Sequence, residues 1–209
     1  MAEPPSSGVA AVGSGATGEP LDPRRYREIL GHFATGVTVV TSLAGDPAQY
    51  AELELTDAGP GPHPWGTTVS AFTSVSLDPP LVLVSIGRDR QIHAILARTR
   101  RFAVNILGEE SQALSDCFSG APSTLPRTAF CGAPHRPGVT GMPILEDAIA
   151  YMECETDRTI DGGDHTLYVG RVVQAGVARE QDLPLLYFRG RYLRIERATA
   201  LELLGKPEA

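Results

Sequence analysis

The chain has 209 residues, of which 42% are hydrophobic and 21% are charged, and its formal net charge is -7. This length and composition suit one globular domain with an ordinary core. The negative net charge excludes general nucleic-acid binding, which depends on clustered Lys and Arg.

No membrane segment or export signal is expected. Apolar stretches such as residues 80–86 are far too short to cross a bilayer. The N-terminus also lacks a basic region followed by an apolar one. We therefore expect a cytoplasmic protein.

The cysteines Cys117, Cys131 and Cys154 are an odd number with irregular spacing. This spacing resembles neither a disulfide framework nor a CxxC metal site. We expect all three to be buried thiols.

Residues 1–21 are rich in Ala, Gly, Ser and Pro and have no periodic apolar pattern. They predict a disordered tail before a single domain at 22–209. Within the tail, residues 13–18 match the dinucleotide-binding pattern GxGxxG. That pattern binds a pyrophosphate only between a strand and a helix that follows at once. Because Glu-Pro-Leu-Asp-Pro comes next, we reject a dinucleotide site there.

The first predicted element is a helix, because Asp22 is a good N-cap and Pro23 suits the first helical position. Its apolar residues at helical spacing are Tyr26, Ile29, Leu30 and Phe33. Gly36 ends this helix, and the β-branched residues of 37–43 predict a strand.

Residues 44–64 carry four acids and four prolines without a clear period, which indicates an exposed loop insertion. Beyond it, apolar patterns predict strands at 66–69, 81–86, 102–107, 148–155, 166–178 and 185–195. Two short helices are expected, one burying Ile92, Ile95 and Leu96 and one from near residue 109 burying Leu114 and Phe118. We expect a polar loop after the strand at 66–69, irregular chain at 120–142, a reversal at 161–164 and a short helix at 198–204.

Many strands, few short helices and no regular alternation of the two predict a mainly β fold, a β-barrel with a few short helices. Residues 66–76 of this barrel read Gly-Thr-Thr-Val-Ser-Ala-Phe-Thr-Ser-Val-Ser. Amides and short hydroxyls around a concavity are what a flavin ring and its phosphate require. Composition alone favours a simpler interpretation, a Ser/Thr-rich strand edge.

The order of motifs resembles the flavin reductase-like family, which has the FMN-binding split barrel. The matching segments are FATGVTVVT at 33–41, TVSAFTSVSLDPPLV at 68–82, FAVNIL at 102–107, GDH at 163–165 and PLLYFRGRY at 184–192. They run from about residue 26 to 193, and the chain is most similar to reductase components of two-component monooxygenases. The resemblance implies a homodimeric reductase that uses NADH or NADPH to reduce FMN or FAD for a separate monooxygenase.

The resemblance also implies the site residues. The cofactor-binding positions are Thr67, Thr68, Val69, Ser70, Ala71, Ser74, Ser76, Ser85, Ile86, Gly87, Arg88, Gln91, Arg191 and Tyr192. Residues 68–71 would present backbone and hydroxyl donors to the isoalloxazine edge, and Arg88 would pair with the phosphate through its planar fork. His165 would be the catalytic position, where it orients the nicotinamide and does not act as a nucleophile. An exposed loop charge explains Arg88 as well, and ordinary strand alternation explains Arg191 and Tyr192.

The turn after Arg88 departs from the family pattern. Relatives often have Ser or Thr here, whereas this chain has Asp89, Arg90 and Gln91. Because Asp89 would repel a phosphate, we expect it to point away, and the choice between FMN and FAD stays open. Asp164 is either a turn residue or the partner that fixes the His165 tautomer, and we favour the turn.

Other functions find less support. The remaining histidines share no metal-ligand spacing, and no acidic pair, Ser-His-Asp order or Walker loop has a suitable context. The alternatives are a noncatalytic flavin-binding module, since the same barrel can hold FMN without turnover, and a flavin-dependent reductase of a metal complex.

Overall fold

The computed structural model describes residues 21–45, 62–126, 128 and 130–196. The rejected GxGxxG pattern, almost all of the predicted tail, most of the predicted insertion and the predicted helix at 198–204 therefore lie outside the described residues.

The protein is mainly β, as the sequence predicts. Its helices are α1 (Pro23–Leu30), α2 (Gln91–Thr99) and α3 (Gln112–Ser119). Its strands are β1 (Thr35–Gly36), β2 (Thr38–Ala44), β3 (His63–Val69), β4 (Phe72–Leu77), β5 (Pro80–Gly87), β6 (Arg101–Leu107), β7 (His135–Pro137), β8 (Pro143–Leu145), β9 (Ala148–Gly162), β10 (His165–Val177), β11 (Leu186–Phe188) and β12 (Arg191–Leu193). The insertion was predicted at 44–64. Because β2 runs to Ala44 and β3 begins at His63, the connection between these strands is residues 45–62, slightly shorter at both ends.

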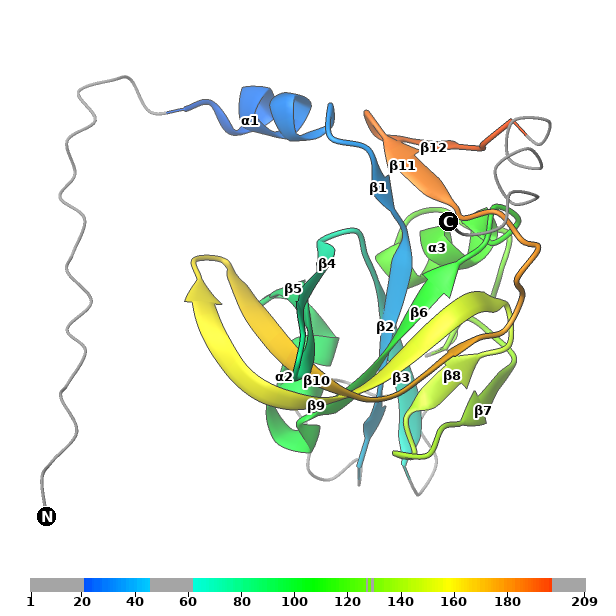
Figure 1. Cartoon of the computed structure of the whole chain (residues 1–209). Helices are drawn as coiled ribbons and strands as arrows, with labels where there is room; N and C mark the ends of the chain where they lie inside the picture. The colour runs from blue at the N-terminus through cyan, green and yellow to red at the C-terminus, as the bar shows by residue number, and fades with distance from the viewer. Residues whose placement is uncertain (1–20, 46–61, 127, 129, 197–209) are drawn as a thin grey trace, which may run out of the picture.

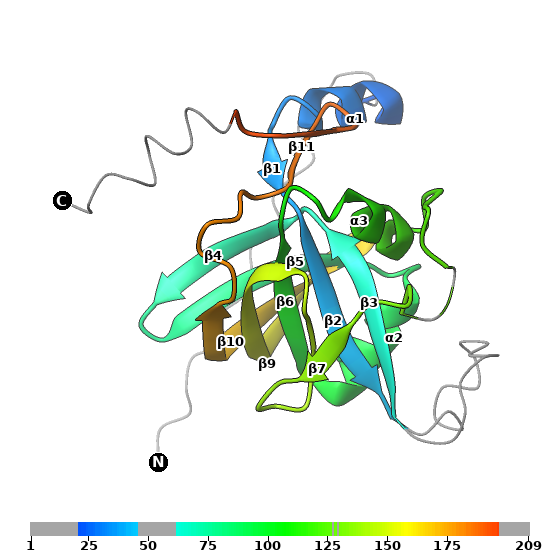
Figure 2. The ribbon, with the colours of Figure 1, turned by 90° about the vertical axis from the view of Figure 1, so that its right-hand side faces the viewer.

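Seven antiparallel strands form the main sheet in the order β3-β2-β6-β9-β10-β5-β4. Its two outermost strands, β3 and β4, follow each other in the chain, and only Ser70 and Ala71 separate them. The backbone amide of Ser85 donates to the carbonyl of Ala71 at 3.1 Å, so β5 reaches this link. The sheet must therefore curl until its two edges share one corner, which makes it a barrel (Figures 1 and 2).

The β9–β10 hairpin is the longest element and extends beyond the body of the barrel (Figure 1). It turns at Gly163, whose φ of 79° suits glycine. Farther along β10, a Cβ on Gly170 would lie 2.5 Å from the ring of Phe102 in β6. The glycine therefore leaves room for this ring in the barrel core.

Two main groups of buried side chains form the core. Inside the barrel, Val84, Phe102 and Tyr168 pack against Ile92 and Leu96 of α2. The second group lies beneath α3. It includes Val39, Leu107, Leu114, Phe118 and Phe130. Both predicted apolar helix faces are thus confirmed, and they cover different parts of the sheet.

Three predictions about local structure are wrong. The predicted polar loop contains β4, an edge strand whose backbone pairs with β5 although most of its side chains are exposed. The predicted strand at 185–195 is a hairpin of β11 and β12, reversed by Arg189 and Gly190 with φ of 49° and 76°. The irregular region at 120–142 includes β7, which pairs with β8 just beyond it.

The expectation of three free thiols is also wrong. Cys117 and Cys131 form a disulfide, and only Cys154 of the three is a buried free thiol. The chain after α3 folds back on the helix, which brings the two Cα atoms to 6.1 Å. A separation of 14 residues carries no sign of this reversal.

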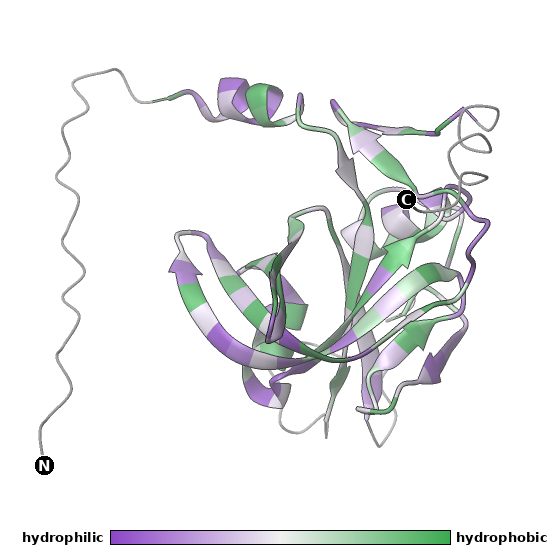
Figure 3. Ribbon diagram, viewed as in Figure 1, coloured by the Kyte–Doolittle hydropathy of each residue, from purple (hydrophilic) through white to green (hydrophobic). Residues whose placement is uncertain are grey.

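Helix α1 ends at Leu30, with Gly31 as its C-cap, earlier than the predicted end at Gly36. Asp22 caps it as predicted, accepting hydrogen bonds from the amides of Arg24 and Arg25. None of its residues is buried, although it carries hydrophobic side chains (Figure 3). Among the described residues, every helix is too short or too polar to span a membrane.

Candidate functional site

A cavity of about 630 Å³ lies at the corner where the sheet's edges meet. The end of β3, the link to β4, the end of β5 and the β9–β10 turn surround it. Its lining residues are Thr67, Thr68, Val69, Ser70, Ala71, Ser85, Ile86, Gly87, Arg88, Asp89, Arg90, Asp164 and His165. The structure thus brings together ten of the predicted site residues, which come from segments up to about a hundred positions apart.

Both apolar and polar residues line the cavity. Of the apolar lining residues, Ala71 is exposed, whereas the side chains of Val69 and Ile86 belong to the barrel core, and Thr67, Ser70 and Ser85 carry hydroxyls. The hydroxyl of Thr68 donates to the carbonyl of Ser115 in α3 at 2.7 Å, so the predicted donors of residues 68–71 exclude this one, and the others stay a prediction. The Thr68 oxygen can still accept a hydrogen bond from a ligand.

Arg88 reaches the cavity but is fixed to the β9–β10 turn. Its Nη2 donates to Oδ2 of Asp161 at 2.6 Å, and its backbone amide donates to the carbonyl of Asp164 at 3.0 Å. The amide of Gly163 and then Arg88 hold the pKa of the Asp161 carboxyl below its usual value. The remaining guanidinium N–H groups of Arg88 are on a side chain that is 46% exposed.

The next two residues were not among the predicted site positions, yet both line the cavity. The Oδ1 of Asp89 lies 2.6 Å from where a Cβ on Gly87 would be, and its side chain is 83% exposed; that it points away from a bound phosphate stays a prediction. Arg90 donates from Nη1 to the carbonyl of Ser119 at 3.3 Å, and its Nε lies 4.0 Å from Asp89. The signal for Arg90 was its place directly after a buried strand and before α2, two residues beyond Arg88.

His165 begins β10 and pairs in register with Gly87 of β5 and Gly162 of β9. Its Nδ1 lies 2.7 Å from Oδ1 of Asp164. The prediction that Asp164 serves only the turn is therefore incomplete, because its carboxylate also orients the imidazole. The hydrogen bond with His165 is the first cause of the lowered pKa of Asp164.

With Nδ1 held by a carboxylate, the other ring nitrogen of His165 is left to face the cavity. Its Nε2 lies 3.7 Å from the Cβ position of Gly87. A Cβ at position 87 would thus be in ordinary contact with His165 and would displace only the exposed carboxylate of Asp89.

Five predicted positions lie outside the cavity lining. They are Ser74 and Ser76 in β4, Gln91 at the start of α2, and Arg191 and Tyr192 in β12. The hydroxyl of Tyr192 donates to Oγ of Ser115 at 2.9 Å or to Oδ1 of Asp116 at 3.0 Å, so this side chain contacts α3 and not the cavity. Burial is the main cause of its raised phenol pKa. Direct contact of these five residues with a flavin stays a prediction.

A barrel corner with a row of hydroxyls, two arginines and an oriented histidine suits the class of flavin-nucleotide-binding oxidoreductases. The family model described as "Flavin reductase like domain" matches residues 30–196. The chain belongs to this family.

Relatives over most of the chain agree with this assignment. It is 35% identical over 186 residues to a flavin-dependent monooxygenase reductase subunit, HsaB, of Rhodococcus jostii, covering 88% of this chain and 85% of that protein. It is 36% identical over 188 residues to an NADH-dependent flavin reductase of a Rhodococcus species, covering 90% and 92%.

Solved structures give the same result. The flavin reductase PheA2 superposes with a TM-score of 0.69 at 32% identity, covering 84% of this chain and 99% of PheA2. SgcE6, an NADH:FAD oxidoreductase of Streptomyces globisporus solved with NAD and FAD fragments, has a TM-score of 0.68 at 32% identity and covers 86% of this chain and 98% of its own.

Proposed function

We propose that this protein is an NAD(P)H:flavin oxidoreductase that transfers a hydride from a reduced nicotinamide to FMN or FAD and supplies reduced flavin to a partner monooxygenase. The observation that carries the proposal is the convergence of the hydroxyl-rich link, the two arginines and the His165–Asp164 pair on one cavity. Relatives named as NADH-dependent flavin reductases favour NADH as the donor.

The residues at the corner fit a flavin nucleotide. Its ring would lie along the link of Ser70 and Ala71 and the end of β5, and Arg88 and Arg90 would pair with its phosphate. Asp89 stands between the two arginines, so it lowers the local positive charge and limits how many phosphates this turn favours.

When bound, the flavin supplies the hydride-accepting atom, and the protein contributes orientation and exclusion of water. His165 would contact the incoming nicotinamide from the Nε2 side, while Asp164 fixes its Nδ1 as a donor. A side chain that only orients a substrate changes the KM for that substrate more than it changes flavin affinity.

The test is anaerobic turnover of purified protein with NADH or NADPH and excess FMN or FAD, followed by loss of nicotinamide absorbance. For His165→Ala we expect KM for NADH to rise about tenfold, while the Kd for FMN changes less than about twofold. His63→Ala, at the far end of β3, is the matched control. No turnover by wild-type protein that binds flavin would leave a noncatalytic flavin-binding module. Faster oxidation of NADH with a ferric chelate than with free flavin would favour the metal-complex reductase.

We also propose that two copies associate as a homodimer in the cytoplasm. The support is the exposed apolar surface of α1 and of Phe33, three residues beyond its end. Tyr26, Ile29 and Leu30 are each about half exposed, and Phe33 is 78% exposed. A monomer rarely leaves such a patch uncovered. Light scattering after size exclusion tests this, with Ile29→Glu and Phe33→Ser expected to shift the wild-type dimer towards monomer.

A further inference from the structure

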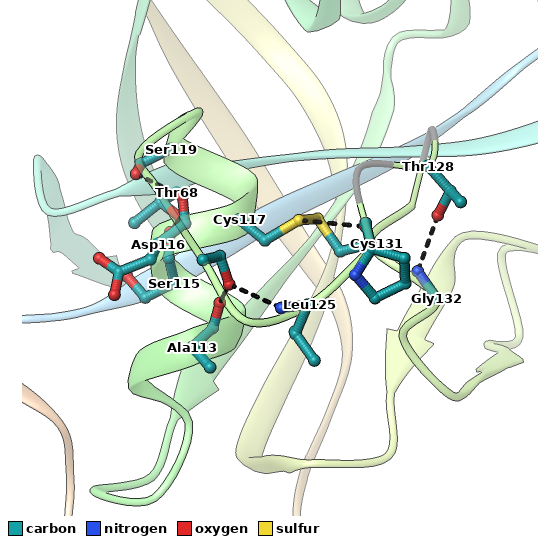
Figure 4. The surroundings of a disulfide bond; sticks show 12 residues. Thr68, Ala113, Ser115, Asp116, Cys117, Ser119, Leu125, Thr128, Cys131 and Gly132 are labelled. Atoms are coloured by element: carbon teal, nitrogen blue, oxygen red, sulfur yellow. Dashed lines mark hydrogen bonds between the residues drawn. A yellow bond between two sulfur atoms is a disulfide. The ribbon is translucent and has the colours of Figure 1, made fainter.

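The disulfide between Cys117 and Cys131 joins the last turn of α3 to the segment that follows it (Figure 4). Cys154 differs in kind, because burial, and then the charge of Glu153, raise its thiol pKa to about 12. A thiol that stays protonated reacts slowly. Any thiol–disulfide chemistry of the described cysteines therefore belongs to the Cys117–Cys131 pair.

Helix α3 forms part of the support of the flavin cavity. The ring of Phe118 lies so close over Gly66 that a Cβ there would be 2.6 Å from it. The carbonyl of Ser115 accepts from Thr68 at 2.7 Å, and that of Ser119 accepts from Arg90 at 3.3 Å. Since Thr68 and Arg90 line the cavity, a shift of α3 moves groups on two of its walls.

The other end of the disulfide lies in an unfavourable backbone turn. Cys131 has φ of 56° and Gly132 has φ of 60°, a region that residues with a Cβ rarely adopt. Thr128 supports the turn, with its carbonyl accepting from the Cys131 amide at 3.1 Å and its Oγ1 accepting from the Gly132 amide at 2.9 Å. Without the cross-link, Cys131 can leave this conformation, and the constraint on α3 is lost with it.

The two sulfur atoms differ in access. Cys117 is partly exposed, whereas Cys131 is 4% exposed. A dithiol reductant would thus attack Sγ of Cys117, forming a mixed disulfide and releasing Cys131 as a thiolate that takes up a proton. The second thiol of the reductant then displaces Cys117, so two electrons and two protons pass to the protein and the reductant becomes a disulfide.

Reoxidation needs hydrogen peroxide, which forms when reduced flavin transfers two electrons and two protons to oxygen. Peroxide oxidises one cysteine to a sulfenic acid and releases water, and the other thiol displaces a second water to restore the disulfide. In a cytoplasm that keeps thiols reduced, a disulfide of this kind is a transient one.

From these contacts we propose that Cys117–Cys131 is a reversible redox site that sets flavin affinity: the disulfide holds α3 against the cavity, and the dithiol form binds flavin more weakly. This inference rests on the proposed function in that flavin is the ligand whose affinity changes. Phe130 packs edge to face against Phe118 at 5.1 Å and against His135 at 4.6 Å. Because neither contact involves the sulfur atoms, we expect reduction to loosen the helix without unfolding the chain.

The experiment measures the Kd for FMN of the full chain, by quenching of FMN fluorescence, before and after dithiothreitol. Thiols are counted in denaturant on the same samples, with one expected before treatment and three after it. We expect the Kd to rise at least about fivefold on reduction, the lower end of usual coupling between sites, and to return after hydrogen peroxide. Cys154→Ser should keep the response, and the double variant Cys117→Ser, Cys131→Ser should bind weakly with or without dithiothreitol.

An equal Kd for samples with one and with three thiols overturns the redox site while leaving the proposed function intact. Failure of peroxide to form the disulfide overturns it as well. Failure of the one-thiol protein to bind either FMN or FAD instead overturns the proposed function. If the double variant does not fold, the comparison of the two wild-type forms decides the result alone.

Discussion

Replacing Gly66 by Ala should destabilise the protein through a single contact with α3. The new Cβ would lie 2.6 and 2.9 Å from Cε1 and Cδ1 of Phe118, whereas carbon atoms pack best at about 3.5–4.0 Å. The ring must retreat by about 1 Å. Phe118 is only 7% exposed and meets the ring of Phe130 at 5.1 Å, edge to face, so it has no empty space to enter.

Overpacking of this kind costs about 1–3 kcal/mol, which for a chain of this size lowers the Tm by roughly 2–12 °C. Urea unfolding of Gly66→Ala should show a lower midpoint at an unchanged slope. Because Phe118 also supports the cavity, the Kd for FMN should rise in the same variant.

Gly36→Ala is the matched control, since nothing lies within 4 Å of its added Cβ. It should change the free energy of unfolding by less than about 0.5 kcal/mol. Gly66→Ala combined with Phe118→Leu should cost less than the sum of the two single changes, because the smaller side chain relieves the overlap. Equal stability of the two alanine variants, or strict additivity in the double variant, would show that the contact is not what requires glycine.

Two further outcomes follow from buried polar contacts. Asn105→Ala should lower the free energy of unfolding by about 2–4 kcal/mol in guanidinium titration. The buried amide of Asn105 donates to Val39 and Thr41 and accepts from the Leu145 amide, and the variant would leave these partners unsatisfied. A loss below about 1 kcal/mol would contradict this explanation. For His93, burial and then Arg88 lower the pKa from its usual 6.5, so the folded state resists a proton that the unfolded chain accepts. Stability should therefore fall as pH drops below 6.5 and level off below the folded pKa, and urea midpoints of His93→Gln between pH 7.5 and pH 5 should vary less than those of wild type.

The sequence allowed much of the barrel to be predicted, because its strands and helices bury long apolar stretches whose period is local information. Strand β4 was missed because an edge strand exposes its hydroxyl residues and loses that contrast. The β11–β12 hairpin was missed because Arg189 adopts a positive φ that its residue type does not signal. The disulfide depends on a reversal of the chain after α3, which no local pattern marks.

For the site, the motif resemblance located the hydroxyl-rich link, the Gly87–Arg88 turn and His165 correctly on one cavity. It could not show that Arg88 is paired with Asp161, nor that Asp89 and Arg90 share the same wall. Those facts depend on which way side chains point from a turn, and tertiary contacts alone decide that. The Asp164–His165 hydrogen bond could not be predicted either, because Asp164 both forms the turn and orients His165, and the sequence alone favoured the turn.

The connections before and after β3 should tolerate insertions and deletions to very different degrees. At its start, the chain leaves the sheet after Ala44 and returns at His63, two residues that face each other in the β2–β3 ladder. Sequence can be inserted or removed there without altering the pairing of any strand. At its end, Ser70 and Ala71 alone join β3 to β4, and one extra residue would turn every side chain of one strand to the opposite face. Labels and fusion partners therefore belong in the first connection, while the second fixes both the closure of the barrel and the shape of its active corner.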